Sequence, residues 1–117
     1  MVTPSVGAVV LLPFPFSDLS NAKLRPAVVL AEAGRGDWIL RQVTSSPYGD
    51  PGAIPLAEAE FKQGGLSHQS FARPGKLFTA SSDLILRQVG VLKAEAIQRV
   101  VRAVIELLRQ ALGVIAE

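Results

Sequence analysis

Two groups of polar side chains stand beside apolar runs of the sequence and could together hold a phosphate. Arg25 directly precedes one run, and Thr44, Ser45 and Ser46 stand at the end of the next. The guanidinium of arginine is permanently charged and offers a rigid fork of donors to phosphate oxygens. Hydroxyl groups can donate hydrogen bonds to the same oxygens. These residue types therefore predict a cradle for a phosphodiester.

A hairpin around these residues is expected to bring them together. The apolar, β-branched run 26–31 and the run 37–45 are separated by a Gly-Arg-Gly turn at residues 34–36. A tight turn between two such runs is typical of a β-hairpin. In antiparallel strands the start of one lies beside the end of the other, so we expect Arg25 and Thr44 to meet.

Composition excludes several other kinds of catalytic site. The chain has no cysteine and a single histidine, His68, so thiolate metal sites, cysteine nucleophiles and paired catalytic histidines are impossible. No Gly-rich phosphate loop or dinucleotide fingerprint occurs. His68 falls on an expected strand, where a structural or surface role is commoner than a catalytic one. Glu58 and Glu60 are expected in an exposed turn, and no metal or cofactor is expected.

The remaining sequence predicts a small, curved sheet or barrel covered by a helix. Further short strands are expected at residues 6–14, 54–56, 67–73, 76–80 and 84–91, with loops or turns at 17–23, 46–52 and 61–65. From Ala94 onward the apolar residues recur at helical spacing. They cover about half of the helix circumference, more than packing on one sheet requires. Either a second copy of the chain covers the surplus, or the helix sits deep on the barrel.

Size and charge fit one domain spanning residues 1–117. The chain has 117 residues, is 49% hydrophobic and 19% charged, and carries a net charge of +2, which excludes a disordered chain. The longest apolar stretch, residues 6–14, is far shorter than the roughly 20 residues of a membrane span, so we expect a cytoplasmic protein. Between Arg73 and Arg109 seven basic residues accompany three acidic ones, a weak indication of nucleic-acid binding.

The same residues carry a resemblance to a known family. Residues 9–20 read Val-Val-Leu-Leu-Pro-Phe-Pro-Phe-Ser-Asp-Leu-Ser, and residues 23–30 read Lys-Leu-Arg-Pro-Ala-Val-Val-Leu. Together with Gln-Val-Thr-Ser at 42–45, Phe61, Gly-Gly-Leu at 64–66 and the segment 73–79, they resemble the PemK/MazF family of type II toxin–antitoxin ribonucleases. The likeness covers nearly the whole chain, and Arg-Pro-Ala-Val-Val-Leu is its most specific part.

This resemblance implies a mainly β fold, a small SH3-like (PemK/CcdB-type) curved barrel with a C-terminal helix. It also implies a homodimeric toxin that cleaves single-stranded RNA, messenger RNA included, at short sequences without a metal. The ribose 2′-hydroxyl would attack its own phosphate, leaving a 2′,3′-cyclic phosphate and a 5′-hydroxyl. Arg25 would stabilise charge on the phosphate, Thr44 would position it, and Arg73 would be a third catalytic residue. An antitoxin would hold the toxin inactive, and DNA would be contacted only through that complex.

Substrate contacts are expected from the polar loops and the residues beside them. The expected contact residues are Ser17, Asp18, Lys23, Ser45, Ser46 and Lys76. The chain departs from the family at three positions: Ala8, Gly75 and Ser81 stand where many members carry acids. The general base is therefore left open. These departures favour an alternative, a non-catalytic toxin or binding module on the same fold, either similar to gyrase poisons or a degenerate RNA binder.

Overall fold

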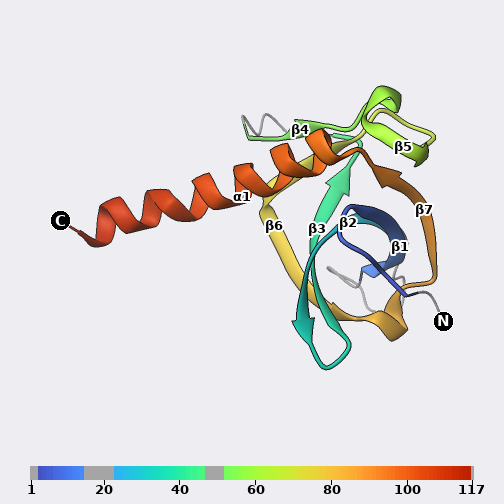
Figure 1. Ribbon diagram of the computed structural model, residues 1–117, viewed down its shortest axis with the longest axis horizontal. Coiled ribbons are helices and arrows are strands. Elements are labelled where there is room, and N and C mark those ends of the chain that lie inside the picture. The colour runs from blue at the N-terminus through green and yellow to red at the C-terminus, as the bar shows by residue number, and fades with distance from the viewer. Residues whose placement is uncertain (1–2, 15–22, 47–51, 117) are drawn as a thin grey trace.

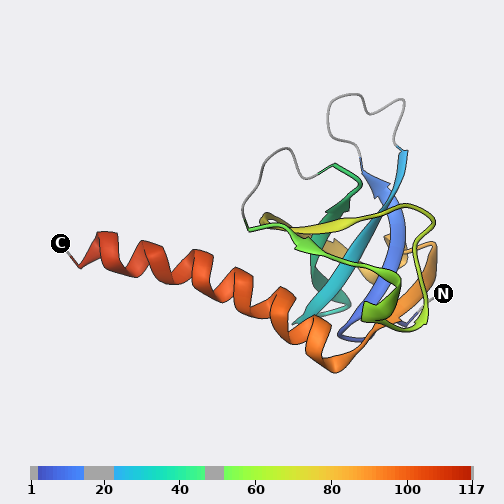
Figure 2. The ribbon, with the colours of Figure 1, turned by 90° about the horizontal axis from the view of Figure 1, so that it is seen from above.

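The computed structural model describes residues 3–14, 23–46 and 52–116. In these ranges seven strands form one sheet in the order β4-β6-β3-β2-β1-β7-β5, and every pair of neighbours is antiparallel. The sheet curls into a half-barrel, and a long helix leaves one side of it (Figures 1 and 2). The elements are β1 (Ala8–Phe14), β2 (Lys23–Gly34), β3 (Asp37–Thr44), β4 (Ile54–Pro55), η2 (Glu58–Glu60), β5 (Phe61–Gly64), β6 (Phe71–Ser81), η3 (Ser82–Leu84), β7 (Arg87–Leu92) and α1 (Ala94–Ile115). The expected fold class is confirmed.

The predicted hairpin is present as β2 and β3. Val28 pairs with Arg41 and Ala27 with Gln42. The turn at residues 34–36 uses left-handed backbone throughout, with φ of 94° at Gly34, 55° at Arg35 and 81° at Gly36. Glycine adopts such φ values without steric cost, which explains why two of the three turn residues are glycines.

Three sequence expectations between residues 61 and 80 are wrong. The expected turn at 61–65 is largely strand β5, which pairs with β7. The expected strand at 67–73 begins only at Phe71, so His68 lies on the connection between β5 and β6. The two strands expected at 67–73 and 76–80 are one strand, because the β3–β6 ladder shifts register between Arg41 and Val43 and then resumes. A bulge of this kind absorbs extra residues without ending a strand.

The core has two clusters on opposite faces of the first strands. Val10 and Val29 belong to one cluster, whereas Val9 and Val28 belong to the other, which also includes the start of α1. Successive side chains of a strand point to opposite faces. Strands β1 and β2 are therefore buried on both faces, which accounts for their nearly continuous apolar sequences.

Helix α1 packs against the sheet only through its first turns. Ala96 and Val100 are buried, and two arginines tie this part to the barrel. Arg41 of β3 is fully buried and donates to the carbonyl oxygens of Val100 (2.8 Å) and Ala72 (2.9 Å). Arg99 of α1 forms an exposed ion pair with Glu60.

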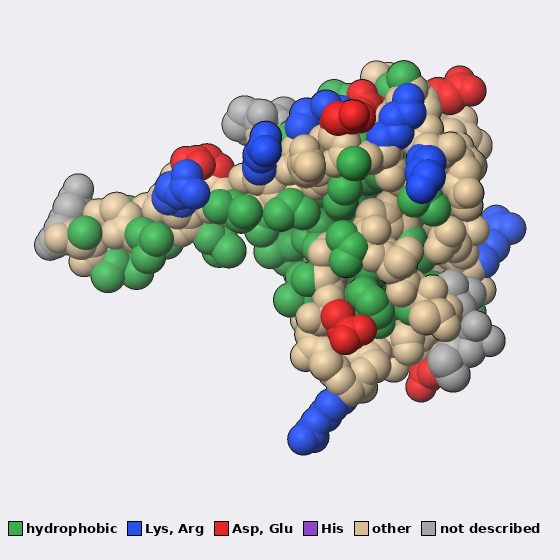
Figure 3. Space-filling model, viewed as in Figure 1, with side chains coloured by type: hydrophobic (Ala, Val, Ile, Leu, Met, Phe, Trp, Pro, Cys, Tyr) green, Lys and Arg blue, Asp and Glu red, His purple; other side chains and the backbone are tan. Residues whose placement is uncertain are grey.

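The second half of α1 extends away from the barrel. Its apolar residues are exposed, with Leu108 60%, Leu112 66% and Ile115 77% accessible, and they form an apolar stripe along the helix (Figure 3). The expectation that the helix sits deep on the barrel is therefore wrong for this half, and its coverage by a second copy stays a prediction. No helix in the described ranges is long and apolar enough to cross a membrane.

Candidate functional site

The start of β2 and the end of β3 border an open cavity of about 370 Å³, here called the Arg25 cavity. Its third wall is the connection between β5 and β6. The lining residues are Leu11, Lys23, Leu24, Arg25, Pro26, Val43, Thr44, Ser45, Leu66, Ser67, His68 and Ser70.

The hairpin register explains why Arg25 and Thr44 line one cavity. The β2–β3 ladder pairs Ala27 with Gln42 at this end of the hairpin. Two residues further along each strand stand Arg25 and Thr44. Arg25 is also held from its other side, opposite Leu12 of β1. Because β2 lies between β1 and β3, the half-buried Arg25 is placed by two neighbouring strands.

The Thr44 hydroxyl closes a small turn at the end of β3. It donates to the carbonyl oxygen of Ser46 (3.0 Å) and accepts from the backbone N–H of Ser46 (3.1 Å). Hydroxyl side chains commonly form such local turns. To donate to a phosphate oxygen, Thr44 must exchange its bond to the Ser46 carbonyl for one to the ligand.

The lining of the Arg25 cavity suits an anion. Two basic side chains, Arg25 and Lys23, line it, and none of its described lining residues is Asp or Glu. The hydroxyls of Ser45, Ser67 and Thr44 add possible donors. The hydroxyl of Ser70, a buried residue, donates to the carbonyl oxygen of His68 (2.9 Å), which braces the third wall. A positive cavity with hydroxyl donors matches the chemistry of a phosphate group.

Some of the site residues expected from the sequence line the Arg25 cavity, and others lie elsewhere. Lys23, Arg25, Thr44 and Ser45 all line the Arg25 cavity. The half-buried Arg73 and the exposed Lys76 lie on β6, and neither lines it. Ser46 contacts Thr44 through its backbone but is absent from the lining. Ser17 and Asp18 lie outside the described residues.

Sequence reasoning missed the contribution of the β5–β6 connection. Leu66, Ser67 and His68 line the cavity, although His68 was expected on a strand with a structural or surface role. The polar run Ser-His-Gln-Ser at residues 67–70, which comes after Gly-Gly-Leu, was the available signal. No group of three or more His, Cys, Asp or Glu that could hold a metal occurs in the described part of the chain.

Two of the departures from the family have structural roles. Ala8 is completely buried in the first core cluster, where an acidic side chain would be costly to desolvate. The Ser81 hydroxyl accepts from the backbone N–H of Asp83 (3.2 Å) and caps η3. Neither residue lines the Arg25 cavity.

A family model extends over most of the chain. The family described as "PemK-like, MazF-like toxin of type II toxin-antitoxin system" matches residues 5–108. The chain belongs to this family. It is therefore a toxin of a type II toxin–antitoxin system, and the resemblance stated from the sequence is confirmed. No curated protein matches the toxin.

Solved structures share the toxin's fold. MazF from Deinococcus radiodurans (Form-I) is similar with a TM-score of 0.72 and 21% identity, covering 92% of this chain and 98% of that one. MazE-MazF (Form-III) from the same organism gives 0.71 and 23%, covering 90% and 95%. An endoribonuclease in complex with its cognate antitoxin, from a mycobacterial species, gives 0.71 and 12%, covering 91% and 95%.

Proposed function

We propose that this toxin is an endoribonuclease that cleaves single-stranded RNA, messenger RNA included, at short sequences without a metal. The observation that carries the proposal is that Arg25 and Thr44 line the same cavity, together with a lysine and further hydroxyl groups. Membership of the family supports it. A mycobacterial protein of the same fold is an endoribonuclease.

The proposed reaction takes its nucleophile from the substrate. The ribose 2′-hydroxyl loses its proton and attacks the adjacent phosphorus, and the bond from phosphorus to the 5′ oxygen breaks. The products are a 2′,3′-cyclic phosphate and a 5′-hydroxyl, whose oxygen takes up a proton. The protein then has to align the nucleophile and stabilise negative charge on the phosphoryl oxygens. Arg25 supplies the charge, and Thr44 supplies a hydroxyl donor once it releases Ser46. Arg73 is retained as a third candidate catalytic residue from the resemblance.

The proposal includes the toxin's partners. Relatives of the same fold were solved as MazE-MazF and as a complex with a cognate antitoxin, and we propose an antitoxin that inhibits this chain as well. DNA would be contacted only through that complex. A homodimer is supported by the exposed apolar stripe of α1. Because messenger RNA is the proposed substrate, we also propose a cytoplasmic location.

The test is cleavage of a long single-stranded RNA in the presence of EDTA. We expect the parent to cleave, and Arg25→Ala to lower the rate by about 10²–10³-fold, the usual effect of removing one preorganised donor to the transition state. Thr44→Ala should also lower the rate, and Thr44→Ser should retain activity because the hydroxyl remains. Arg109→Ala is the matched control, since Arg109 is exposed on α1 and forms an ion pair with Glu106 on the same helix.

Two results would contradict the proposal. One is a parent that yields no RNA products under these conditions, and the other is unchanged cleavage by both Arg25→Ala and Thr44→Ala. RNA binding without products would favour the alternative of a non-catalytic binding module. The existing bond between Thr44 and the Ser46 carbonyl is the observation that keeps this alternative in view.

A further inference from the structure

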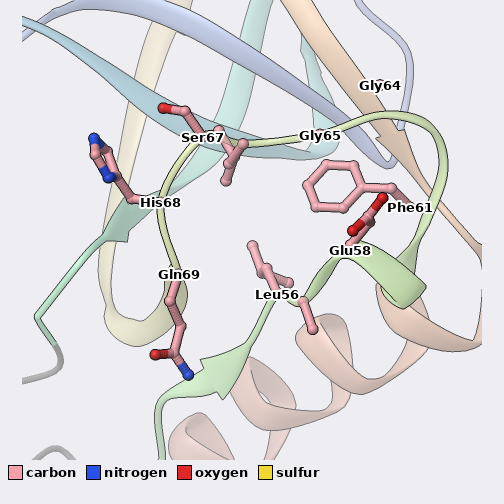
Figure 4. Close-up of a pocket in the computed structure, with 10 residues that line it drawn as sticks. Leu56, Glu58, Phe61, Gly64, Gly65, Ser67, His68 and Gln69 are labelled. Carbon is pink, nitrogen blue, oxygen red and sulfur yellow. The ribbon is translucent and has the colours of Figure 1, made fainter.

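A second cavity, of about 510 Å³, adjoins the Arg25 cavity and is here called the Phe61 cavity. Both cavities are lined by Leu66, Ser67 and His68 of the β5–β6 connection. Figure 4 shows Leu56 and the Phe61 ring directed into the space enclosed by residues 64–69, with the His68 ring directed away from it. One segment of backbone therefore serves as a wall for two sites.

The lining of the Phe61 cavity differs in charge from that of the Arg25 cavity. None of its described lining residues is Lys or Arg, so a phosphate group has no cation to bind there. Its apolar surface comes from Leu56, Leu66 and Phe61, and its polar groups include the Glu58 carboxylate and the Gln69 amide. In the view of Figure 4 the Glu58 carboxylate and the Phe61 ring are drawn on the same side of the cavity that both residues line. This combination suits a flat, uncharged ring that carries a hydrogen-bond donor.

The part of the Phe61 cavity wall formed by residues 61–65 is held by close contacts to β7. A Cβ on Gly64, whose φ is +67°, would lie 2.2 Å from the Val89 carbonyl oxygen, and a Cβ on Gly90 would lie 2.8 Å from the Phe61 ring. The backbone N–H of Gly65 donates to the Val89 carbonyl oxygen at 3.1 Å. Phe61 itself is only 7% exposed. A preformed cavity avoids the cost of ordering side chains when a ligand binds.

We propose that the Phe61 cavity binds the base of a nucleotide next to the phosphate held by Arg25, and that it selects bases with an exocyclic amine. The base packs between the apolar side chains that line the cavity, Leu56, Leu66 and the little of Phe61 that is exposed. The Glu58 carboxylate accepts a hydrogen bond from the amine, as acidic side chains do from cytosine N4. The volume falls within the usual range for small-ligand pockets, about 300–1,000 Å³. The inference rests on the proposed function, since it assumes that RNA occupies the Arg25 cavity.

The test uses two fluorescein-labelled hexamers, one of 2′-O-methylcytidine and one of 2′-O-methyluridine. Cytosine carries an amine at C4 and an acceptor nitrogen at N3, whereas uracil carries a carbonyl at C4 and an N–H at N3, so only the cytidine hexamer has the exocyclic amine. The blocked 2′ oxygen prevents cleavage. By fluorescence anisotropy we expect the parent to bind the cytidine hexamer about five- to tenfold more tightly, the discrimination expected of one good base-edge contact. Glu58→Gln should bring this ratio close to one, because an amide can either accept or donate.

Two further variants make the comparison specific. Glu32→Gln, an exposed carboxylate near the β2–β3 turn that lines neither cavity, should keep the parent ratio. Phe61→Leu changes the shape of one apolar wall and should weaken both hexamers to a similar extent, with circular dichroism used to check that the variant folds.

The results separate this inference from the proposed function. Equal binding of the two hexamers by the parent overturns the inference of a base-binding cavity. That result is also the one expected if the cavity receives an apolar side chain of the antitoxin and not a base. An unchanged ratio in Glu58→Gln also overturns it. If the parent cleaves RNA and Arg25→Ala does not, while Glu58→Gln cleaves with the same base preference, the function stands and the inference fails. If the cytidine preference depends on Glu58 but RNA is never cleaved, the inference stands without the cleavage.

Discussion

Replacing Arg41 with methionine tests whether the fully buried arginine holds α1 to the sheet. Its two terminal nitrogens donate to the carbonyl oxygens of Val100 in α1 and Ala72 in β6. The acceptors lie 59 and 31 residues away in the sequence, so the guanidinium joins three distant parts of the chain. Methionine fills a similar space but leaves both carbonyls without this donor.

The expected cost follows from the number and kind of hydrogen bonds. Bonds that involve a charged group contribute about 1.5–3 kcal/mol each, so the two bonds give a gross loss of about 3–6 kcal/mol. Removing the guanidinium also removes the cost of burying a charge, which returns part of this. We expect a net loss of about 2 kcal/mol in the free energy of unfolding. Arg99 also joins α1 to the barrel, but in its ion pair with Glu60 the Arg99 side chain is 48% exposed and the Glu60 side chain 28% exposed. Arg99→Met should therefore lower the free energy of unfolding by less than about 1 kcal/mol.

Urea unfolding of the parent and both variants measures the difference. Trp38 fluorescence and circular dichroism should be followed at one fixed protein concentration, because self-association would change the apparent stability. Arg41→Met should shift the midpoint to clearly lower urea with a similar slope. The reasoning would be refuted if Arg99→Met cost as much as Arg41→Met, or if Arg41→Met were more stable than the parent.

Two further predictions concern the projecting helix and the close approach of β5 to β7. The double variant Leu108→Glu, Leu112→Glu should fold normally, since both side chains are largely exposed. By light scattering at micromolar concentration we expect the parent to be a dimer and the double variant a monomer. A monomeric parent or a dimeric double variant contradicts this prediction. Gly64→Ala should lower the free energy of unfolding by about 2 kcal/mol or more because of its positive φ and the contact of the new Cβ with Val89. Gly113→Ala, where a Cβ meets nothing within 4 Å, should be neutral or raise stability by up to about 1 kcal/mol, and equal stability of the two variants would count against the argument.

The sequence predicted what depends on local patterns and missed what depends on distant contacts. The β2–β3 hairpin and the start of α1 followed from the turn glycines and from hydrophobic periodicity, and the hairpin alone was enough to place Arg25 near Thr44. Strand β5 was missed because the run Gln-Gly-Gly at residues 63–65, where the strand ends, is typical of a turn, whereas Gly64 is needed where β5 meets β7.

Arg41 and His68 show the same difference. From the sequence alone, an arginine within a strand is expected to point to solvent. Arg41 is buried because α1 and β6 supply carbonyl acceptors for its guanidinium. His68 reaches the Arg25 cavity because the β5–β6 connection returns to the hairpin, a path that no local pattern indicates.

The wall shared by the two cavities has a consequence for selectivity. Residues 66–68 border both the Arg25 cavity and the Phe61 cavity, so a ligand that shifts this segment in one cavity changes the other. The two binding events then have a coupling free energy, and each alters the affinity of the other by the same factor. A base that fits the Phe61 cavity would improve the alignment of the neighbouring phosphate, whereas a poorly fitting base would bind without aligning it. Discrimination among RNA sequences would then appear in kcat as well as in KM.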